Sequence, residues 1–171
     1  MWESIRKSLQ AVGQWSGKGV SFLTLLMVFG MLTNALLSNL FSINFIALQE
    51  STTWLHATVF MLGAAYTLQH NEHVRVDIFY QRWSKKTQAW IDIVGTLIFL
   101  FPVCIFIFVS SLSYVKLSWR LSEASQEVGG LPAIYLLKTL VLIMPILLII
   151  EGLHQILLKA DVIKTTKQQE Q

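Results

Sequence analysis

The chain has 171 residues, of which 54% are hydrophobic and only 13% are charged, and its mean hydropathy is +0.56. Soluble domains carry about 25% charged residues, so this composition excludes an ordinary soluble protein and predicts a membrane protein. The net charge of +3 does not indicate a nucleic-acid partner, because the positive charges lie at the ends of apolar runs rather than on one basic face.

Four apolar segments are long enough to cross a bilayer as helices. We therefore expect an all-α membrane protein that forms a single domain over residues 1–171, with four transmembrane helices at about 16–40, 52–68, 87–116 and 133–158. The first apolar run is too long for a cleaved signal peptide and should remain as a helix. Pro102 should bend the third helix, because proline removes a backbone donor and clashes with the preceding turn. Cys104 is the only cysteine, which excludes an intrachain disulfide.

A short segment at 74–83, after the second span, has the pattern of an amphipathic helix. Its apolar residues follow the i, i+3, i+4, i+7 spacing of one helix face: Val76, Phe79, Tyr80 and Trp83. Such a segment would lie at the membrane surface, with nearby Arg and Lys side chains on anionic lipid.

The distribution of positive charge predicts the topology. Ten of the thirteen Lys and Arg residues lie in the N-terminal segment, in the loop at 69–87 and in the C-terminal tail. The positive-inside rule therefore places both termini in the cytoplasm and the loop at 117–131 on the opposite side of a bacterial inner membrane.

Small residues end the second apolar segment at Gly63, Ala64 and Ala65. Small side chains allow a neighbouring helix to approach closely in lipid. We expect this stretch to be a helix-packing site, and the mixed polar segment that follows to be a cytoplasmic hinge.

Charged and titratable residues inside spans are candidates for function. Asp92, Glu151 and His154 all fall in the inner third of the predicted membrane, and the i, i+3 spacing puts Glu151 and His154 on one helix face. They could form a proton relay or ion site, or a structural polar cluster. We favour the structural interpretation, because no such group occurs at the midplane, where transporters usually bind substrate.

His70 and His154 could lie at similar depths, as two axial haem ligands would. However, His70 stands in a polar stretch at a helix end, beside Glu72 and His73, which disfavours this assignment. The chain also contains no zinc-ligand spacing, phosphate loop or nucleophile triad. We therefore expect no enzyme activity, no metal and no cofactor in this chain.

Charged residues gather on the predicted outer side. They are Glu50, Arg120, Glu123, Glu127 and Lys138, around a Gly-Gly-Leu-Pro turn at 129–132. Two interpretations stay open: a solvated loop that closes on itself through weak ion pairs, or a docking rim on which charge pairs orient a periplasmic protein.

Several of these motifs, in this order, resemble the small membrane (Q) subunit of TRAP transporters, the tripartite ATP-independent periplasmic transporters. The resemblance covers about residues 16–158 and depends on the following features: Glu50 at the start of the second helix, Leu62-Gly-Ala-Ala-Tyr66, Glu72-His-Val-Arg-Val-Asp77, the segment from Arg120 to Ser125, Gly130-Leu131-Pro132 and Lys138.

The resemblance implies a non-catalytic scaffold and anchor for a large multi-span permease subunit. That subunit would hold the sodium and organic-acid sites, and a periplasmic substrate-binding protein would deliver the substrate. Three sets of contact residues follow: Gly63, Ala64, Ala65 and Tyr66 against the large subunit; His73, Arg75, Asp77 and Trp83 at the cytoplasmic hinge; and the charged outer rim against the binding protein. The alternatives are a haem- or quinone-associated anchor of a redox complex and a small homo-oligomeric transporter.

Overall fold

The computed structural model describes the backbone of residues 2–70 and 82–169, and the side chains of 17–70 and 82–165. This part of the chain is helical with short connections. The helices are α1 (Trp2–Phe41), α2 (Ile46–Gln69), α4 (Lys85–Gly95), the π-helical turn η1 (Thr96–Leu100), α5 (Phe101–Arg120) and α6 (Ile134–Gln169).

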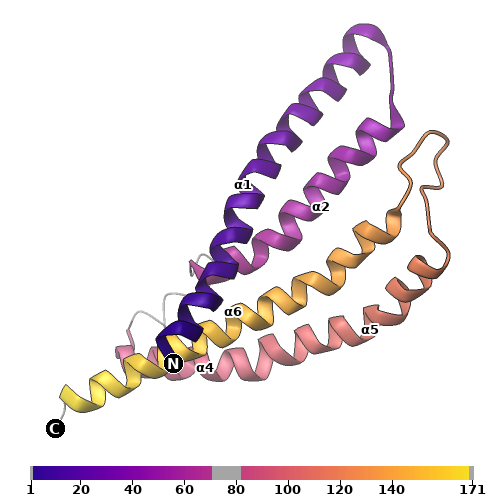
Figure 1. Cartoon of the computed structure of the whole chain (residues 1–171). Helices are drawn as coiled ribbons and strands as arrows, with labels where there is room; N and C mark the ends of the chain where they lie inside the picture. Colours follow the sequence, from indigo (N-terminus) through magenta and orange to yellow (C-terminus); the bar gives the residue numbers. More distant parts are fainter. Residues whose placement is uncertain (1, 71–81, 170–171) are drawn as a thin grey trace.

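The long helices lie side by side in the order α1, α2, α6 and α5 (Figure 1). Two antiparallel hairpins, α1/α2 and α5/α6, meet where α2 contacts α6. The hairpins spread apart toward the end that carries the connections 42–45 and 121–133, which we call the loop end, and both termini lie toward the other end, the terminal end (Figure 1).

Three helical stretches in the described part are long and apolar enough to cross a membrane: Gly17–Phe41, Lys85–Arg120 and Ile134–Thr165. They coincide with three of the four predicted spans. The fourth prediction, 52–68, falls within α2, which is a 24-residue helix. This helix does not reach the same hydropathy, so the four-span count is not reproduced.

Polar side chains on α2 explain its lower hydropathy. The hydroxyl groups of Thr52 and Thr58 donate to the carbonyls four residues earlier, at 2.9 and 2.7 Å, which reduces the cost of placing them in an apolar environment. Thr52 and His56 also line a cleft of about 480 Å³ together with Asn34 of α1. Part of the polar surface of α2 is therefore turned toward α1.

The helix contains a π-helical turn, η1, directly before the predicted bend at Pro102. In η1, the N–H of Phe101 bonds to the carbonyl of Thr96, five residues earlier. Proline at 102 cannot donate to the carbonyl four residues before it and would clash with it. The wider π turn relieves that conflict, so α4, η1 and α5 continue as one helical path.

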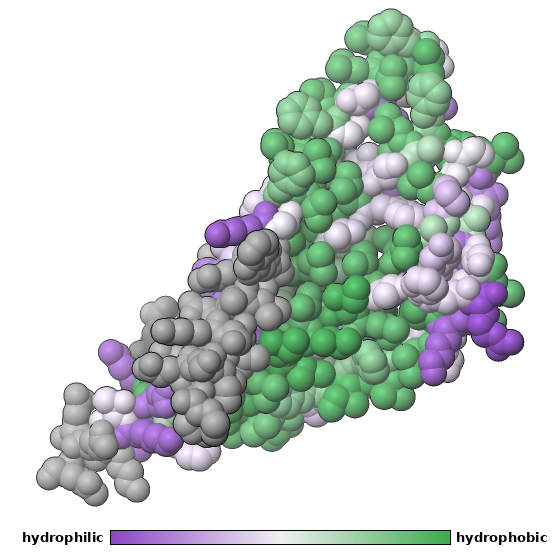
Figure 2. Space-filling view, in the orientation of Figure 1, coloured by the Kyte–Doolittle hydropathy of each residue, from purple (hydrophilic) through white to green (hydrophobic). Residues whose placement is uncertain are grey.

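The fold buries little apolar surface of its own. The buried hydrophobic residues among the described side chains are small or medium-sized: Ala65, Ala89, Cys104 and Val115. In contrast, Phe60, Phe99 and Phe106 are each about 70% exposed, and apolar residues cover much of the face seen in Figure 2. A monomeric soluble protein rarely exposes such large apolar patches, so the helices are covered by lipid or by another subunit.

Candidate functional site

The small-residue stretch at 63–66 lies on the contact between α1 and α2. A Cβ atom on Gly63 would meet the side chain of Val20 at 3.6 Å, and Ala65 is only 2% exposed. The ring of Tyr66 lies directly over Gly17, where a Cβ atom would come within 2.1 Å of it. Gly63 and Tyr66 therefore pack against α1 of the same chain, and the contact of residues 63–66 with a large subunit stays a prediction.

Gly17 was not singled out from the sequence, although its lack of a side chain makes room for the Tyr66 ring. Its environment in the sequence, Trp15-Ser-Gly-Lys18, indicates only an interfacial helix start. One pattern in the sequence could have indicated it. In an antiparallel hairpin the end of the second helix lies beside the start of the first, so a large aromatic residue such as Tyr66 can lie opposite a glycine such as Gly17.

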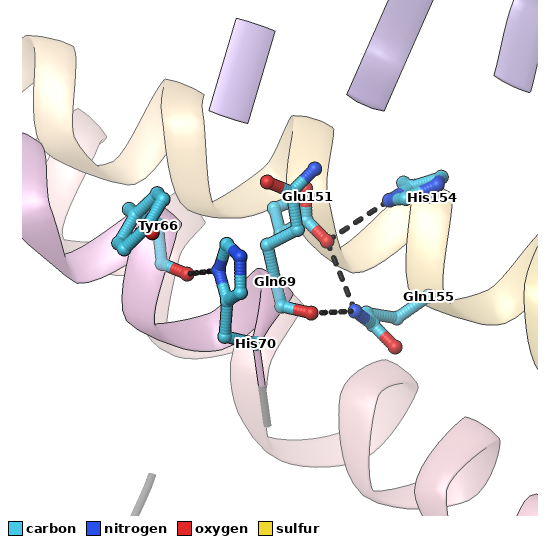
Figure 3. Close-up of polar contacts among 6 residues, drawn as sticks. All are labelled: Tyr66, Gln69, His70, Glu151, His154 and Gln155. Atoms are coloured by element: carbon cyan, nitrogen blue, oxygen red, sulfur yellow. Dashed lines mark hydrogen bonds and ion pairs between the residues drawn. The ribbon is translucent and has the colours of Figure 1, made fainter. Parts of the chain in front are cut away.

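A buried polar cluster lies toward the terminal end, on α6 and the last turn of α2 (Figure 3). Glu151, His154 and Gln155 are 1%, 4% and 8% exposed. Glu151 Oε1 lies 3.0 Å from His154 Nδ1 and accepts a hydrogen bond of 3.0 Å from Gln155 Nε2. The same Nε2 also reaches the backbone carbonyl of Gln69 at 3.3 Å. The cluster therefore joins α6 to α2.

Glu151 and His154 were predicted to share one helix face, as they do in the structure, whereas Gln155 was not predicted to join them. On a helix, an amide side chain four residues after a carboxylate can reach it. The i, i+4 spacing of Glu151 and Gln155 could therefore have predicted this hydrogen bond. The second carboxylate oxygen, Oε2 of Glu151, has no hydrogen-bond partner among the described residues.

Asp92 forms an ion pair outside this cluster. Its Oδ2 atom lies 2.8 Å from Lys159 Nζ, and the two side chains are 15% and 23% exposed. Asp92 stands on α4 and Lys159 on α6, so the pair joins the helical path of α4, η1 and α5 to α6. Asp92 and Gln155 line the same groove.

Each of the two histidines considered as haem ligands contacts its own helix through Nδ1. His70 Nδ1 lies 3.0 Å from the carbonyl of Tyr66, and the two rings stack with centroids 4.1 Å apart. His154 Nδ1 faces Glu151. Among the described residues, no three His, Cys, Asp or Glu side chains come together in a group that could hold a metal ion.

The residues predicted to form a cytoplasmic hinge lie mainly outside the described part of the chain. This holds for His73, Arg75 and Asp77 and for most of the predicted surface segment at 74–83. Trp83 is described: it is 45% exposed and lines the groove that also contains Asp92.

At the loop end, Glu50 binds the connection between α5 and α6. The hydroxyl of Ser125 donates to Glu50 Oε1, and the backbone N–H of Leu131 donates to Oε2 at 2.6 Å. We call these three residues the loop clasp. Gly130 makes it feasible, because a Cβ there would lie 2.6 Å from Ser125 Cβ and 2.9 Å from the Glu50 carboxylate. The hydrogen bond from Ser125, followed by that from Leu131, lowers the pKa of Glu50 below its ordinary value.

Two further rim residues are paired within the chain. Lys138 Nζ lies 2.5 Å from Glu123 Oε2 and 4.2 Å from the centre of the Tyr114 ring. The hydrogen bond from Lys138 is the main cause of a lowered pKa of Glu123. The remaining two residues of the predicted rim, Arg120 and Glu127, are exposed. The structure thus brings Glu50, Glu123 and Lys138 to one loop and uses them to hold it.

A comparison with protein families identifies the family of the chain. The model of the DctQ component of tripartite ATP-independent periplasmic transporters matches residues 23–161. No curated protein and no solved structure matches the chain. The matched region includes the polar cluster, the Asp92–Lys159 pair and the loop clasp, whereas Gly17 and Val20 of the α1–α2 contact precede it. It therefore covers most of the chain, and the family is one of transporter components rather than of enzymes. This multi-pass membrane protein belongs to the DctQ family, the small permease component of TRAP transporters.

Proposed function

We propose that the chain is the scaffold and membrane anchor of a large permease subunit in a sodium-driven TRAP transporter for an organic acid. The observation that carries this proposal is the open layer of helices, whose large apolar side chains are exposed rather than packed in an interior. Such a layer offers long apolar faces on which a second membrane subunit can pack.

The polar groups of the helices support a structural rather than a transporting role. Glu151 is held by Gln155 and lies against His154, and Asp92 is paired with Lys159. The Asp92–Lys159 pair joins α4 to α6, and Gln155, which binds Glu151 within α6, also reaches the carbonyl of Gln69 on α2. A carboxylate oxygen that makes such contacts stabilises the arrangement of the helices. It is then less available to coordinate a transported sodium ion. We accordingly place the sodium and substrate sites in the large subunit.

The rim at the loop end would contribute to docking of the periplasmic binding protein. The loop clasp and the Glu123–Lys138 pair give this loop a defined shape. Arg120, Glu127 and Val128, which is 92% exposed, remain available on its surface. Exposed charges of this kind orient a partner and set its association rate. This arrangement requires the loop end to face the periplasm and both termini to lie in the cytoplasm, as the distribution of Lys and Arg predicts.

The test uses the assembled transporter reconstituted in vesicles, with Asp92→Asn and Glu151→Gln made singly and together. An amide keeps the volume but removes the charge that a hard cation requires from its ligands. If the chain is a scaffold, the variants assemble in the same or smaller amounts and their sodium dependence is unchanged. A shift in sodium affinity, or in the ratio of sodium to substrate, in a normally assembled variant would assign these residues to the coupling site instead.

A further inference from the structure

An open groove with a volume of about 740 Å³ runs along the contact between α6 and the path formed by α4, η1 and α5. Its walls are mainly apolar and include Leu68, Ile91, Phe99, Leu100, Val103 and Leu148. The volume lies in the range of sites that hold small ligands. Gly95 also lines the groove, and the space beside it is open, because a Cβ atom there would meet nothing within 4 Å.

One part of the groove is polar. Its lining includes Asp92 and Lys159, which form the 2.8 Å ion pair, together with Gln155 and Trp83. These residues lie toward the terminal end of the molecule. Tryptophan, with an apolar ring and a polar N–H, is favoured where hydrocarbon meets water. The groove therefore has the polarity of a single lipid molecule, with a charged end at the interface and an apolar body.

The groove is too short to follow a helix across the whole bilayer. On α6 its lining extends from Lys159 to Leu148, a rise of about 16 Å at 1.5 Å per residue. The hydrocarbon core is about 30 Å thick, so one leaflet contributes about 15 Å. On the wall formed by α4, η1 and α5 the lining extends from Ile91 to Ile107, a rise of about 24 Å, and ends there although α5 continues to Arg120. A transmembrane helix of a partner would need a groove along the whole span.

We propose that this groove binds one phospholipid with an ethanolamine headgroup, taken from the leaflet on the side of the chain termini. The phosphate lies at Lys159, the ammonium group lies at Asp92, and an acyl chain follows the apolar wall past Gly95 and Leu100. This inference concerns a lipid, and it does not depend on the scaffold role proposed above.

The charge pair selects the headgroup. A zwitterionic headgroup supplies an anion for Lys159 and a cation for Asp92. A purely anionic lipid satisfies Lys159 but places negative charge beside Asp92. A choline headgroup has the required charges, but its quaternary nitrogen has no N–H to donate to the carboxylate, so it loses a charge-assisted hydrogen bond. The expected order of affinity is ethanolamine, then choline, then glycerol headgroups.

The experiment compares two glycine variants of the full-length chain. Gly95→Leu places a side chain in the groove, where space is available. Gly19→Leu adds the same side chain on α1, where a Cβ atom also meets nothing within 4 Å. Each protein is equilibrated in nanodiscs that contain equal amounts of phosphatidylethanolamine, phosphatidylcholine and phosphatidylglycerol, and retained lipid is measured by native mass spectrometry. The wild type and Gly19→Leu should each retain one phosphatidylethanolamine.

Gly95→Leu should lower this occupancy about tenfold, because displacing about two methylene groups from the groove weakens binding by that factor.

In a second variant, Asp92→Asn, the preference for phosphatidylethanolamine over phosphatidylglycerol should fall, because the carboxylate that repels an anionic lipid is gone. The proposal would be wrong if Gly95→Leu and Gly19→Leu retained equal amounts of lipid. It would also be wrong if the retained lipids showed no preference among the three headgroups. A Gly95→Leu variant that keeps the lipid but loses a co-purifying membrane subunit would overturn it too, and would assign the groove to a helix of that subunit.

Discussion

The backbone N–H of Leu131 donates a 2.6 Å hydrogen bond to the carboxylate of Glu50, a residue 81 positions earlier in the chain. Glu50 stands on α2 and Leu131 in the connection before α6, so the bond joins the two hairpins at the end where they spread apart (Figure 1). The hydroxyl of Ser125 binds the other oxygen of the same carboxylate. One side chain thus holds the connection between α5 and α6 against the first hairpin.

Replacing Glu50 should release this connection. In Glu50→Ala, both carboxylate oxygens are removed, so Ser125 and Leu131 each lose their acceptor. Amide hydrogen exchange at Leu131 should accelerate by roughly threefold to tenfold, the range expected for the loss of one hydrogen bond. Glu127→Ala is the matched control, because that side chain is exposed on the same loop. Equal exchange rates in the two variants would contradict the loop clasp.

The lowered pKa values of Glu50 and Glu123 predict how the loop responds to acid. A carboxylate whose pKa is lower in the folded state stabilises the fold above its ordinary pKa of 4.5, and this contribution is lost as the pH falls through the lowered value. The loop should therefore be fully held at neutral pH and loosen only below pH 4.5. A carbon-13 NMR titration of the Glu50 carboxyl group should show a midpoint below 4.5.

The amide proton of Leu131 provides an independent measurement of the same event. Its chemical shift should change with the midpoint of the Glu50 titration, because it donates to that carboxylate. In Glu50→Gln this step should be absent. A midpoint at or above 4.5, or an unchanged titration of Leu131 in the variant, would show that the hydrogen bonds do not stabilise the ionised form.

The contact between Gly17 and Tyr66 predicts a large difference between two neighbouring glycines. In Gly17→Ala, the new methyl group would lie 2.1 Å from the Tyr66 ring, so the ring or the helix must move. Overpacking of this kind costs about 1–3 kcal/mol. Gly19→Ala meets nothing within 4 Å and should be neutral or stabilising by up to about 1 kcal/mol through helix propensity.

Thermal unfolding of the purified protein in detergent measures both variants. Gly17→Ala should melt at a lower temperature than the wild type, and Gly19→Ala should not. Adding Tyr66→Ala to Gly17→Ala should recover part of the loss that is due to the clash. If the two glycine variants melt at the same temperature, then α1 and α2 do not pack through Gly17.

The predicted topology can be tested at two described, exposed positions. Single cysteines at Val128→Cys, on the loop between α5 and α6, and Lys164→Cys, near the end of α6, would be introduced after Cys104→Ala removes the natural thiol. In intact spheroplasts a membrane-impermeant maleimide should label position 128 and not position 164. The reverse pattern would place the termini in the periplasm and would remove the basis for docking at the loop end.

The polarity of α2 illustrates the limit of counting apolar residues. A span was predicted at 52–68, and the structure has a helix there. Its hydropathy is lower than that of the other long helices. Polar residues such as Thr52 and His56 lower the mean, and part of this polar surface is turned toward α1. A mean over a window cannot distinguish polar residues that face a neighbouring helix from polar residues that face lipid.

The partners of the charged residues show a similar limit. The i, i+3 spacing of Glu151 and His154 was sufficient to place them together, because a helix determines which residues share a face. No local rule paired Asp92 with Lys159 or Glu50 with Leu131, since each pair comes from different elements. The charges of the rim were identified, but whether they pair within the chain depended on the conformation of the connection at 121–133.

The sequence by itself determined that this is an all-helical membrane protein, with four predicted spans of which three are strongly apolar helices in the structure, and its ordered motifs indicated the family. These properties are local: they depend on the length of apolar runs, on charge near their ends and on the spacing of residues along one helix. Only the tertiary structure decided that the helices form an open layer, that Tyr66 packs on Gly17, and that Glu50 holds the loop. Those contacts depend on how each helix is rotated and positioned relative to the others. Apolar surfaces alone do not determine this, because many arrangements of apolar helices are similarly favourable in lipid.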